Sequence, residues 1–223
     1  MMREKARARL LELFTSVPVI PVITIEDAGA AVPLARALVA GGLRVVEITL
    51  RTEEAVAAAR AIIANVPEAI VGIGTVLTPS DLEQAAGIGA RFAISPGMSH
   101  DLLDAAAAGE LPFVPGVQTP SDLISCLTRG FDLVKFFPAV PAGGIATLNA
   151  LSGPFPSVRY CPTGGIGEAN VRDWLAHPKV VAVGGSWVAP VADIERSAWS
   201  VIEGRARLAA ALRRGREPKA PDA

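Results

Sequence analysis

The chain has 223 residues, 51% of them hydrophobic, and a formal net charge of −1 at pH 7. This length suits one large α/β domain, and a near-neutral charge without a basic stripe argues against a nucleic-acid partner. Two cysteines and two histidines, with no CxxC or HxxxH spacing, leave little material for a metal site.

The N-terminal segment is basic but does not lead into a long apolar run. Glu12 interrupts the apolar stretch, and Pro18 and Pro21 break it. A membrane span needs about 18 or more apolar residues in succession, and no such run is present in the sequence. We therefore expect a soluble cytoplasmic protein with reduced thiols and no membrane partner.

After an amphipathic opening at 6–14, apolar runs alternate with helical patterns at a nearly even spacing. The runs typical of strands are 17–24, 44–50, 70–73, 91–94, 112–114, 133–136, 158–160 and 180–183. The helical patterns that follow them are 27–40, 53–65, 80–86, 100–108, 120–128, 145–151, 168–175 and 193–213. Eight such units predict an α/β fold, a single (β/α)8 TIM barrel over 1–213 with an extra N-terminal helix. The arginine-rich segment 214–223 is expected to be a flexible tail.

The strand predicted at 133–136 is apolar except for Lys135. An apolar run of this kind is typical of a strand buried on both faces. Burial of a lysine disfavours its ammonium form and leaves free amine, which can attack a ketone to form an imine. The alternative is that Lys135 reaches the surface or closes a buried ion pair of purely structural use.

The second predicted strand carries a carboxylate that can pair with this lysine. Strand alternation puts Glu47, Thr49 and Arg51 on one face, with apolar residues on the other. If the apolar face packs on the helices, Glu47 points into the barrel, where Lys135 can partner it. Arg51 at the rim suits a substrate carboxylate, although a surface ion pair is the alternative.

Two glycine-rich runs follow the last two predicted strands. They are Thr163-Gly164-Gly165-Ile166 and Gly184-Gly185-Ser186. Bare backbone amides can approach an oxyanion, and the loops after strands seven and eight are the usual phosphate site of this barrel. Either run alone is compatible with a simple turn, but the two together favour phosphate binding.

Other polar residues receive plainer interpretations. Gly72-Ile73-Gly74-Thr75 offers open backbone and a rim hydroxyl, and the turns at 95–97 and 114–116 are interpreted as pocket wall. Cys161 is expected to be a packed thiol. His100 and His177 are expected to be capping or surface residues.

Eight ordered runs resemble the 2-keto-3-deoxy-6-phosphogluconate (KDPG) aldolases, also called 4-hydroxy-2-oxoglutarate (KHG) aldolases, over nearly the whole chain. The runs are PVIPVI at 18–23, ALVAGG at 37–42, EITLRT at 47–52, GTVL at 74–77, ISPG at 94–97, VKFFP at 134–138, CPTGGI at 161–166 and GGSW at 184–187. The resemblance implies a class I aldolase on a (β/α)8 barrel that needs no metal or cofactor and forms a homotrimer.

The resemblance also implies roles for individual residues. Lys135 corresponds to the Schiff-base lysine and Glu47 to the general acid/base. Gln118 stands where a small hydroxyl residue is expected, which could alter preference at the aldehyde end. The remaining positions are Arg51, Thr75 and Thr163 for the substrate carboxylate, Pro96 and Phe137 for the pocket, and Gly164, Gly165, Gly185 and Ser186 for the phosphate.

The implied reaction is cleavage of KDPG to pyruvate and glyceraldehyde 3-phosphate, a step of the Entner–Doudoroff pathway, with a side activity on KHG. One alternative is an aldolase for the C4 epimer, the galactonate-derived substrate. Another is a non-catalytic barrel that binds phosphometabolites, and a third is a phosphosugar isomerase. The sequence leaves open the C4 stereopreference, the preference for a phosphorylated aldehyde and the oligomer number.

Overall fold

The computed structural model describes residues 2–213, and the side chains of 8–212. The tail expected at 214–223 lies outside the described residues. The strands are β1 (Val19–Ile23), β2 (Val45–Thr49), β3 (Ile70–Gly74), β4 (Phe92–Ile94), β5 (Phe113–Val114), β6 (Gly116–Val117), β7 (Leu133–Phe136), β8 (Arg159–Tyr160) and β9 (Val183–Gly185). The helices are α1 (Met2–Ser16), α2 (Ala31–Ala40), α3 (Ala55–Asn65), α4 (Pro79–Gly87), α5 (His100–Ala108), α6 (Pro120–Leu127), α7 (Gly144–Ser152), α8 (Val171–Ala176), α9 (Val191–Glu195) and α10 (Trp199–Ala210), with 3-10 turns at Ala28–Ala30 and Ala211–Arg213.

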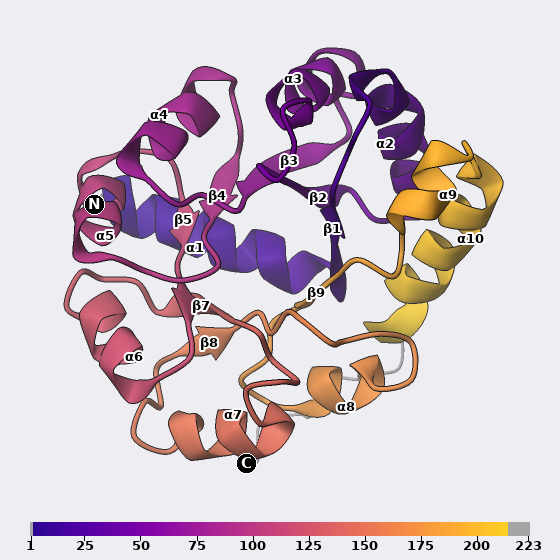
Figure 1. Ribbon diagram of the computed structural model, residues 1–223. Coiled ribbons are helices and arrows are strands. Elements are labelled where there is room, and N and C mark those ends of the chain that lie inside the picture. Colours follow the sequence, from indigo (N-terminus) through magenta and orange to yellow (C-terminus); the bar gives the residue numbers. More distant parts are fainter. Residues whose placement is uncertain (1, 214–223) are drawn as a thin grey trace.

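The strands form one closed parallel barrel. They pair in the orders β5-β4-β3-β2-β1-β9 and β6-β7-β8. Pro115 separates β5 from β6, which are two halves of the fifth barrel strand. Two isolated bridges, from Tyr160 of β8 to Val180 and from Thr163 to Gly184 of β9, connect the segments around these two strands and complete the circle. Figure 1 looks along the barrel, with helices α2 to α10 in a ring around the strands. The predicted (β/α)8 fold is confirmed.

Local sequence signals place several helix starts. The side chains of Thr78 and Thr119 each accept a hydrogen bond from the backbone N–H three residues later. The carboxylates of Asp81 and Asp122 in turn accept from the backbone N–H of these threonines, which completes two capping boxes. A proline follows each threonine at the first helical position, where its missing N–H costs nothing. The same five residues, TPSDL, therefore begin both α4 and α6.

The prediction of one continuous last helix over 193–213 is wrong, because the structure has two helices there, α9 and α10. Residues 196–198 separate α9 from α10, and Ser197 has a left-handed φ of +53° that ends the first helix. Buried Asp193 accepts from Arg196 and Arg205, so one carboxylate ties the break to α10. Residues 196–198 contain no glycine or proline that would mark the break in the sequence.

Helix α1 is the expected extra N-terminal helix, and it closes one end of the barrel (Figure 1). Leu10 and Phe14 pack against inward-facing strand residues, and the Phe14 and Phe92 rings meet edge to face at 5.3 Å. Gly72 makes room for Phe92, because a Cβ there would lie 2.1 Å from that ring. The amino-terminal half of the interior is thus filled, which leaves the carboxyl ends of the strands for a site. None of the helices described is long and apolar enough to cross a membrane.

Candidate active site

Lys135 of β7 and Glu47 of β2 meet inside the barrel. Lys135 Nζ donates to Glu47 Oε1 at 3.0 Å, and the side chains are only 5% and 2% exposed. Strand alternation directs Glu47 inward, because its neighbours Val46 and Ile48 belong to the outer core that contacts the helices. A buried ion pair contributes little net stability compared with an apolar filling, so it is weak evidence for a structural purpose.

Glycine makes the space that Glu47 occupies. A Cβ at Gly74 would lie 2.1 Å from Glu47 Oε1 and 2.6 Å from its Cγ. Gly72, two residues earlier, accommodates Phe92 in the same way. The glycines of the run at 72–75 therefore serve packing inside the barrel, whereas the sequence suggested a backbone left open for a ligand.

The backbone of Lys135 is held by one peptide unit of the split fifth strand. The Pro115 carbonyl accepts from Lys135 N–H at 2.9 Å. The Gly116 N–H of the same peptide donates to Ser95 Oγ at 3.1 Å, and Ser95 is completely buried. The turn at 95–97, interpreted from the sequence as wall, thus also supports the strand next to the lysine. Phe137 lies beside the amine, with its ring centroid 5.4 Å from Lys135 Nζ.

The predicted carboxylate-binding residues lie on three different connections at the carboxyl ends of the strands. Arg51 is exposed, and no ion pair of its guanidinium with another described residue is recorded. Thr163 is nearly buried and packs over Gly184, where a Cβ would lie 2.2 Å from its Oγ1. Thr75 has a φ of +59°, which is rare for a β-branched residue and is found mostly where function requires it. Pro96, in the turn after β4, is half-buried.

The two glycine runs differ in structure. Gly164 and Gly165 form a loop with φ of +100° and +76°, as glycine allows. Gly184 and Gly185 lie within β9 itself, so the prediction that they follow the last strand is wrong. That strand is displaced toward the C-terminus relative to 180–183, with Val183 paired to Val19. A Cβ at Gly185 would lie 1.6 Å from the Trp187 ring, so packing demands this glycine. Ser186 is the first exposed residue after the strand.

The two cysteines and the two histidines are not among the predicted site residues. Cys126 and Cys161 are buried, and burial raises the pKa of Cys126 to about 12. His100 is exposed, whereas His177 is the C-cap residue of α8 and is buried, so it is not a surface residue. Within residues 2–213 no cluster of three or more His, Cys, Asp or Glu is arranged to hold a metal ion.

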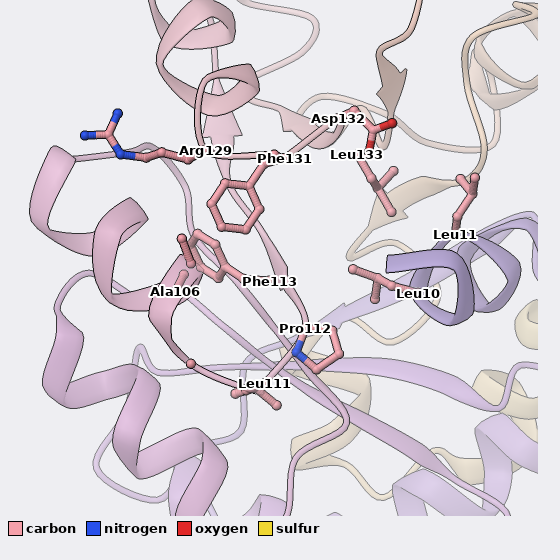
Figure 2. Close-up of a pocket in the computed structure, with 13 residues that line it drawn as sticks. Leu10, Leu11, Ala106, Leu111, Pro112, Phe113, Arg129, Phe131, Asp132 and Leu133 are labelled. Carbon is pink, nitrogen blue, oxygen red and sulfur yellow. The ribbon is translucent and has the colours of Figure 1, made fainter. Parts of the chain in front are cut away.

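A separate pocket of about 330 Å³ lies at the opposite end of the barrel, beside α1. Figure 2 shows Leu10 of α1 facing this space, together with the rings of Phe113 and Phe131. Arg129 at its edge is ion-paired with Asp104. None of the predicted site residues lines this pocket, so it is not a candidate for the active site.

Comparison with known proteins identifies the family of this barrel. Residues 11–204 match the sequence model of KDPG and KHG aldolase. The chain belongs to this family. The family prediction from eight short runs is confirmed, and with it the enzyme class, a carbon–carbon lyase.

Relatives in the KDPG and KHG aldolase family are similar over most of their length. The KHG/KDPG aldolase of Escherichia coli (strain K12) is 51% identical over 88% of this chain and 92% of its own. A KDPG aldolase from Legionella pneumophila, with pyruvate captured as a covalent carbinolamine intermediate, superimposes with a TM-score of 0.87 at 45% identity, covering 89% of this chain and 96% of its own. The KDPG aldolase of Zymomonas mobilis ZM4 with 3-phosphoglycerate gives 0.86 at 41% identity, covering 93% and 98%.

Proposed function

We propose that this protein is a class I aldolase that cleaves KDPG to pyruvate and glyceraldehyde 3-phosphate, with Lys135 as the Schiff-base residue. The observation that carries the proposal is the buried contact between Lys135 Nζ and Glu47 Oε1 at 3.0 Å. A barrel that only binds phosphometabolites has no use for an amine and a base enclosed together. The pyruvate adduct of the Legionella relative and the names of the curated relatives support the same chemistry.

The proposed reaction begins when the free amine of Lys135 adds to the C2 ketone. Loss of water then gives an iminium ion. Glu47, directly or through a water molecule, takes the proton of the C4 hydroxyl, the C3–C4 bond breaks, and its electrons pass into the iminium to form an enamine. Glyceraldehyde 3-phosphate leaves. Protonation of the enamine at C3 and addition of water to C2 release pyruvate and restore the amine.

The groups at the rim are proposed to hold the two ends of the substrate. Arg51, with no recorded ion pair among the described residues, can bind the carboxylate together with the hydroxyls of Thr75 and Thr163. Pro96 and Phe137 line the space between. Backbone amides at Gly164, Gly165 and Gly185, with Ser186, are proposed to bind the phosphate, and 3-phosphoglycerate in the Zymomonas relative is consistent with a phosphate-binding end.

Reductive trapping tests the lysine directly. Incubation with pyruvate and sodium borohydride, followed by intact mass and peptide mapping, should give one pyruvyl adduct on the Lys135 peptide, because reduction turns the imine into a stable amine. Lys135→Ala should give no adduct and no turnover. A folded wild-type protein without the adduct would rule out the lysine mechanism and favour the binding barrel.

Glu47→Gln tests the proposed acid/base. It should lower turnover by about two to four decades while still allowing some adduct to form, since the amide cannot accept the C4 proton but leaves the amine in place. A variant that turns over at the wild-type rate would remove Glu47 from the mechanism. Steady-state turnover and trapping on the same preparation separate the two steps.

A second activity, cleavage of KHG, is favoured by the double name of the Escherichia coli relative. Assays with KDPG, KHG and the galactonate-derived epimer under the same conditions would rank the three substrates. We expect KDPG to be preferred, because the proposed phosphate site then contributes to binding. A preference for the epimer would reassign the C4 stereochemistry while leaving the lysine chemistry intact.

The assembly and the cellular location are also proposals. We propose a homotrimer, so light scattering should give about three times the chain mass of 23.1 kDa. A mass of one chain would contradict the trimer. The two buried thiols and the small-molecule substrate support a location in the cytoplasm. We also propose that the catalytic domain spans 1–213, so removal of 214–223 should leave turnover unchanged.

A further inference from the structure

Asn170 stands immediately before α8, at the N-cap position, yet its side chain does not cap that helix. Asparagine is among the best N-cap residues, so capping would be the ordinary use of its amide. Instead, its Oδ1 accepts from Gly167 N–H at 2.9 Å, and its Nδ2 donates to the Gly165 carbonyl at 3.1 Å. Both ends of the amide are therefore bonded to the loop that follows β8.

Three successive carbonyls of this loop are held by donors from outside it. The Thr163 carbonyl accepts from Ala139 N–H at 2.7 Å, and the Gly164 carbonyl accepts from Val140 N–H at 3.0 Å. The third, at Gly165, is held by Asn170. The first two donors are main-chain groups of the connection between β7 and α7, whereas the third is a side chain that can be exchanged.

These carbonyl bonds determine where the amides of the loop point. In a trans peptide the N–H lies opposite the C=O, so the N–H groups of Gly164, Gly165 and Ile166 face away from the three donors. No acceptor for these three amides is recorded within residues 2–213. Gly164 and Gly165 both have a left-handed φ, and successive amides in such a turn form a concave site for an anion.

We infer that Asn170 is a positioning residue for the phosphate end of the substrate, and that the Ile166 N–H it orients is a third amide donor beside those of Gly164 and Gly165. This inference rests on the proposed function, because it assumes that a phosphate binds this loop. Without the bond from Asn170, the peptide between Gly165 and Ile166 is free to rotate. The Ile166 amide would then no longer be held toward the anion.

The test compares aldol addition of pyruvate to glyceraldehyde 3-phosphate and to glyceraldehyde. Asn170→Ala removes both side-chain bonds. Asn170→Asp can still accept from Gly167 N–H but cannot donate to the Gly165 carbonyl. Asn65→Ala is the matched control, since Asn65 Nδ2 also donates to a backbone carbonyl, that of Ala61 on α3, at 2.8 Å.

For both Asn170 variants we expect the KM for glyceraldehyde 3-phosphate to rise about tenfold or more, as for the loss of a hydrogen bond to a charged group. The kcat/KM for glyceraldehyde and the borohydride-trapped pyruvyl adduct on Lys135 should remain within about twofold of wild type, because neither involves the phosphate. Asn65→Ala should leave both aldehydes unaffected. If Asn170→Ala does not fold, Asn170→Asp supplies the same comparison.

Two results would overturn the inference alone. In the first, the wild-type enzyme forms the adduct and prefers glyceraldehyde 3-phosphate to glyceraldehyde, and both Asn170 variants keep the same preference. The other is an equal loss for both aldehydes, which would make Asn170 a purely structural residue. A wild-type protein that forms no pyruvyl adduct would instead refute the proposed function, and the inference with it.

Discussion

Single residues outside the proposed chemistry support the buried pair of Glu47 and Lys135. Gly74 admits the Glu47 carboxylate, and the buried Ser95 hydroxyl holds the peptide that in turn binds the Lys135 backbone. Neither can be recognised from residue type, because glycine and serine are common in loops for other reasons. Their importance lies in what they touch across the barrel.

Gly74→Ala tests this dependence. The added Cβ would lie 2.1 Å from Glu47 Oε1, so the carboxylate must move away from Lys135. We expect turnover to fall by about two decades or more, the scale of a lost general base. Gly87→Ala, at the end of α4 with nothing within 4 Å of the new Cβ, is the control. Equal turnover in the two variants would show that the space at Gly74 is not needed.

At the scale of elements, α1 closes the amino-terminal end of the barrel. Phe14 is completely buried and meets Phe92 of β4 edge to face. The contact lies at the end of the barrel opposite the opening where substrate is expected to enter. A substitution in the buried face of α1 should therefore lower the stability of the protein without lowering its turnover.

Phe14→Ala should lower the free energy of unfolding by about 3–5 kcal/mol, as for other large cavities left by an aromatic ring. Below its unfolding transition the variant should retain most of its turnover, because the cavity is remote from the pair. Denaturant unfolding and a steady-state assay on the same sample measure both effects. Glu12→Ala, at an exposed position of the same helix, is the control. If the folded Phe14→Ala protein loses turnover as well as stability, this prediction is contradicted.

Buried His177 connects α8 to α7. Its Nε2 is bonded to Asn149 Oδ1 at 2.9 Å, and its Nδ1 accepts from Lys179 N–H at 3.1 Å. Since Nδ1 is an acceptor here, the neutral ring is the form that the fold uses. Burial, and to a smaller extent the charge of Lys179, lowers the pKa of His177 below 6.5.

A pH dependence follows with a definite sign. Below pH 6.5 the unfolded chain protonates this histidine before the folded one does, so the stability it contributes is full above pH 6.5 and is lost as the pH falls through the lower folded pKa. Denaturant midpoints at pH 8 and pH 5.5 should differ less in His177→Gln than in wild type. His100→Gln, at the exposed histidine, should keep the wild-type difference. Identical pH profiles in all three proteins would contradict the assignment.

At the scale of the whole molecule, the barrel closes through a narrow seam. In the described part of the chain, two isolated bridges connect the segment 160–163 to the segment 180–184, and Gly184 takes part in one while also pairing with Ile20 of β1. A Cβ at Gly184 would lie 2.2 Å from Thr163 Oγ1. The seam is therefore closed by a residue that must be small, beside a predicted substrate-binding hydroxyl.

Gly184→Ala should destabilise the protein by about 1–3 kcal/mol, the usual cost of overpacking, and should lower turnover by displacing Thr163. Gly204→Ala is the opposite case, because it lies inside α10 with open space around the new Cβ. It should stabilise the protein by about 0.5–1 kcal/mol. Thermal unfolding of both variants measures these changes, and a Gly184→Ala protein as stable as wild type would show that the seam adapts.

The sequence by itself determined the fold class, the family and the residues to test. Strand alternation directed Glu47 inward, and the apolar run around Lys135 marked a buried strand, because both patterns depend only on neighbours along the chain. The eight family runs are likewise short and linear, and the family they indicated is confirmed. The roles assigned to the individual site residues remain predictions.

Only the tertiary structure decided which partners meet across the barrel. The need for glycine at Gly74 and Gly184, the break between α9 and α10, and the use of the Asn170 amide all depend on contacts between segments that the local pattern does not relate. Glycine in a sequence usually indicates backbone freedom, whereas Gly74 and Gly184 are needed because a side chain from a distant segment occupies the space of a Cβ. Closure of the barrel brings those side chains together, and it is a property of the whole chain.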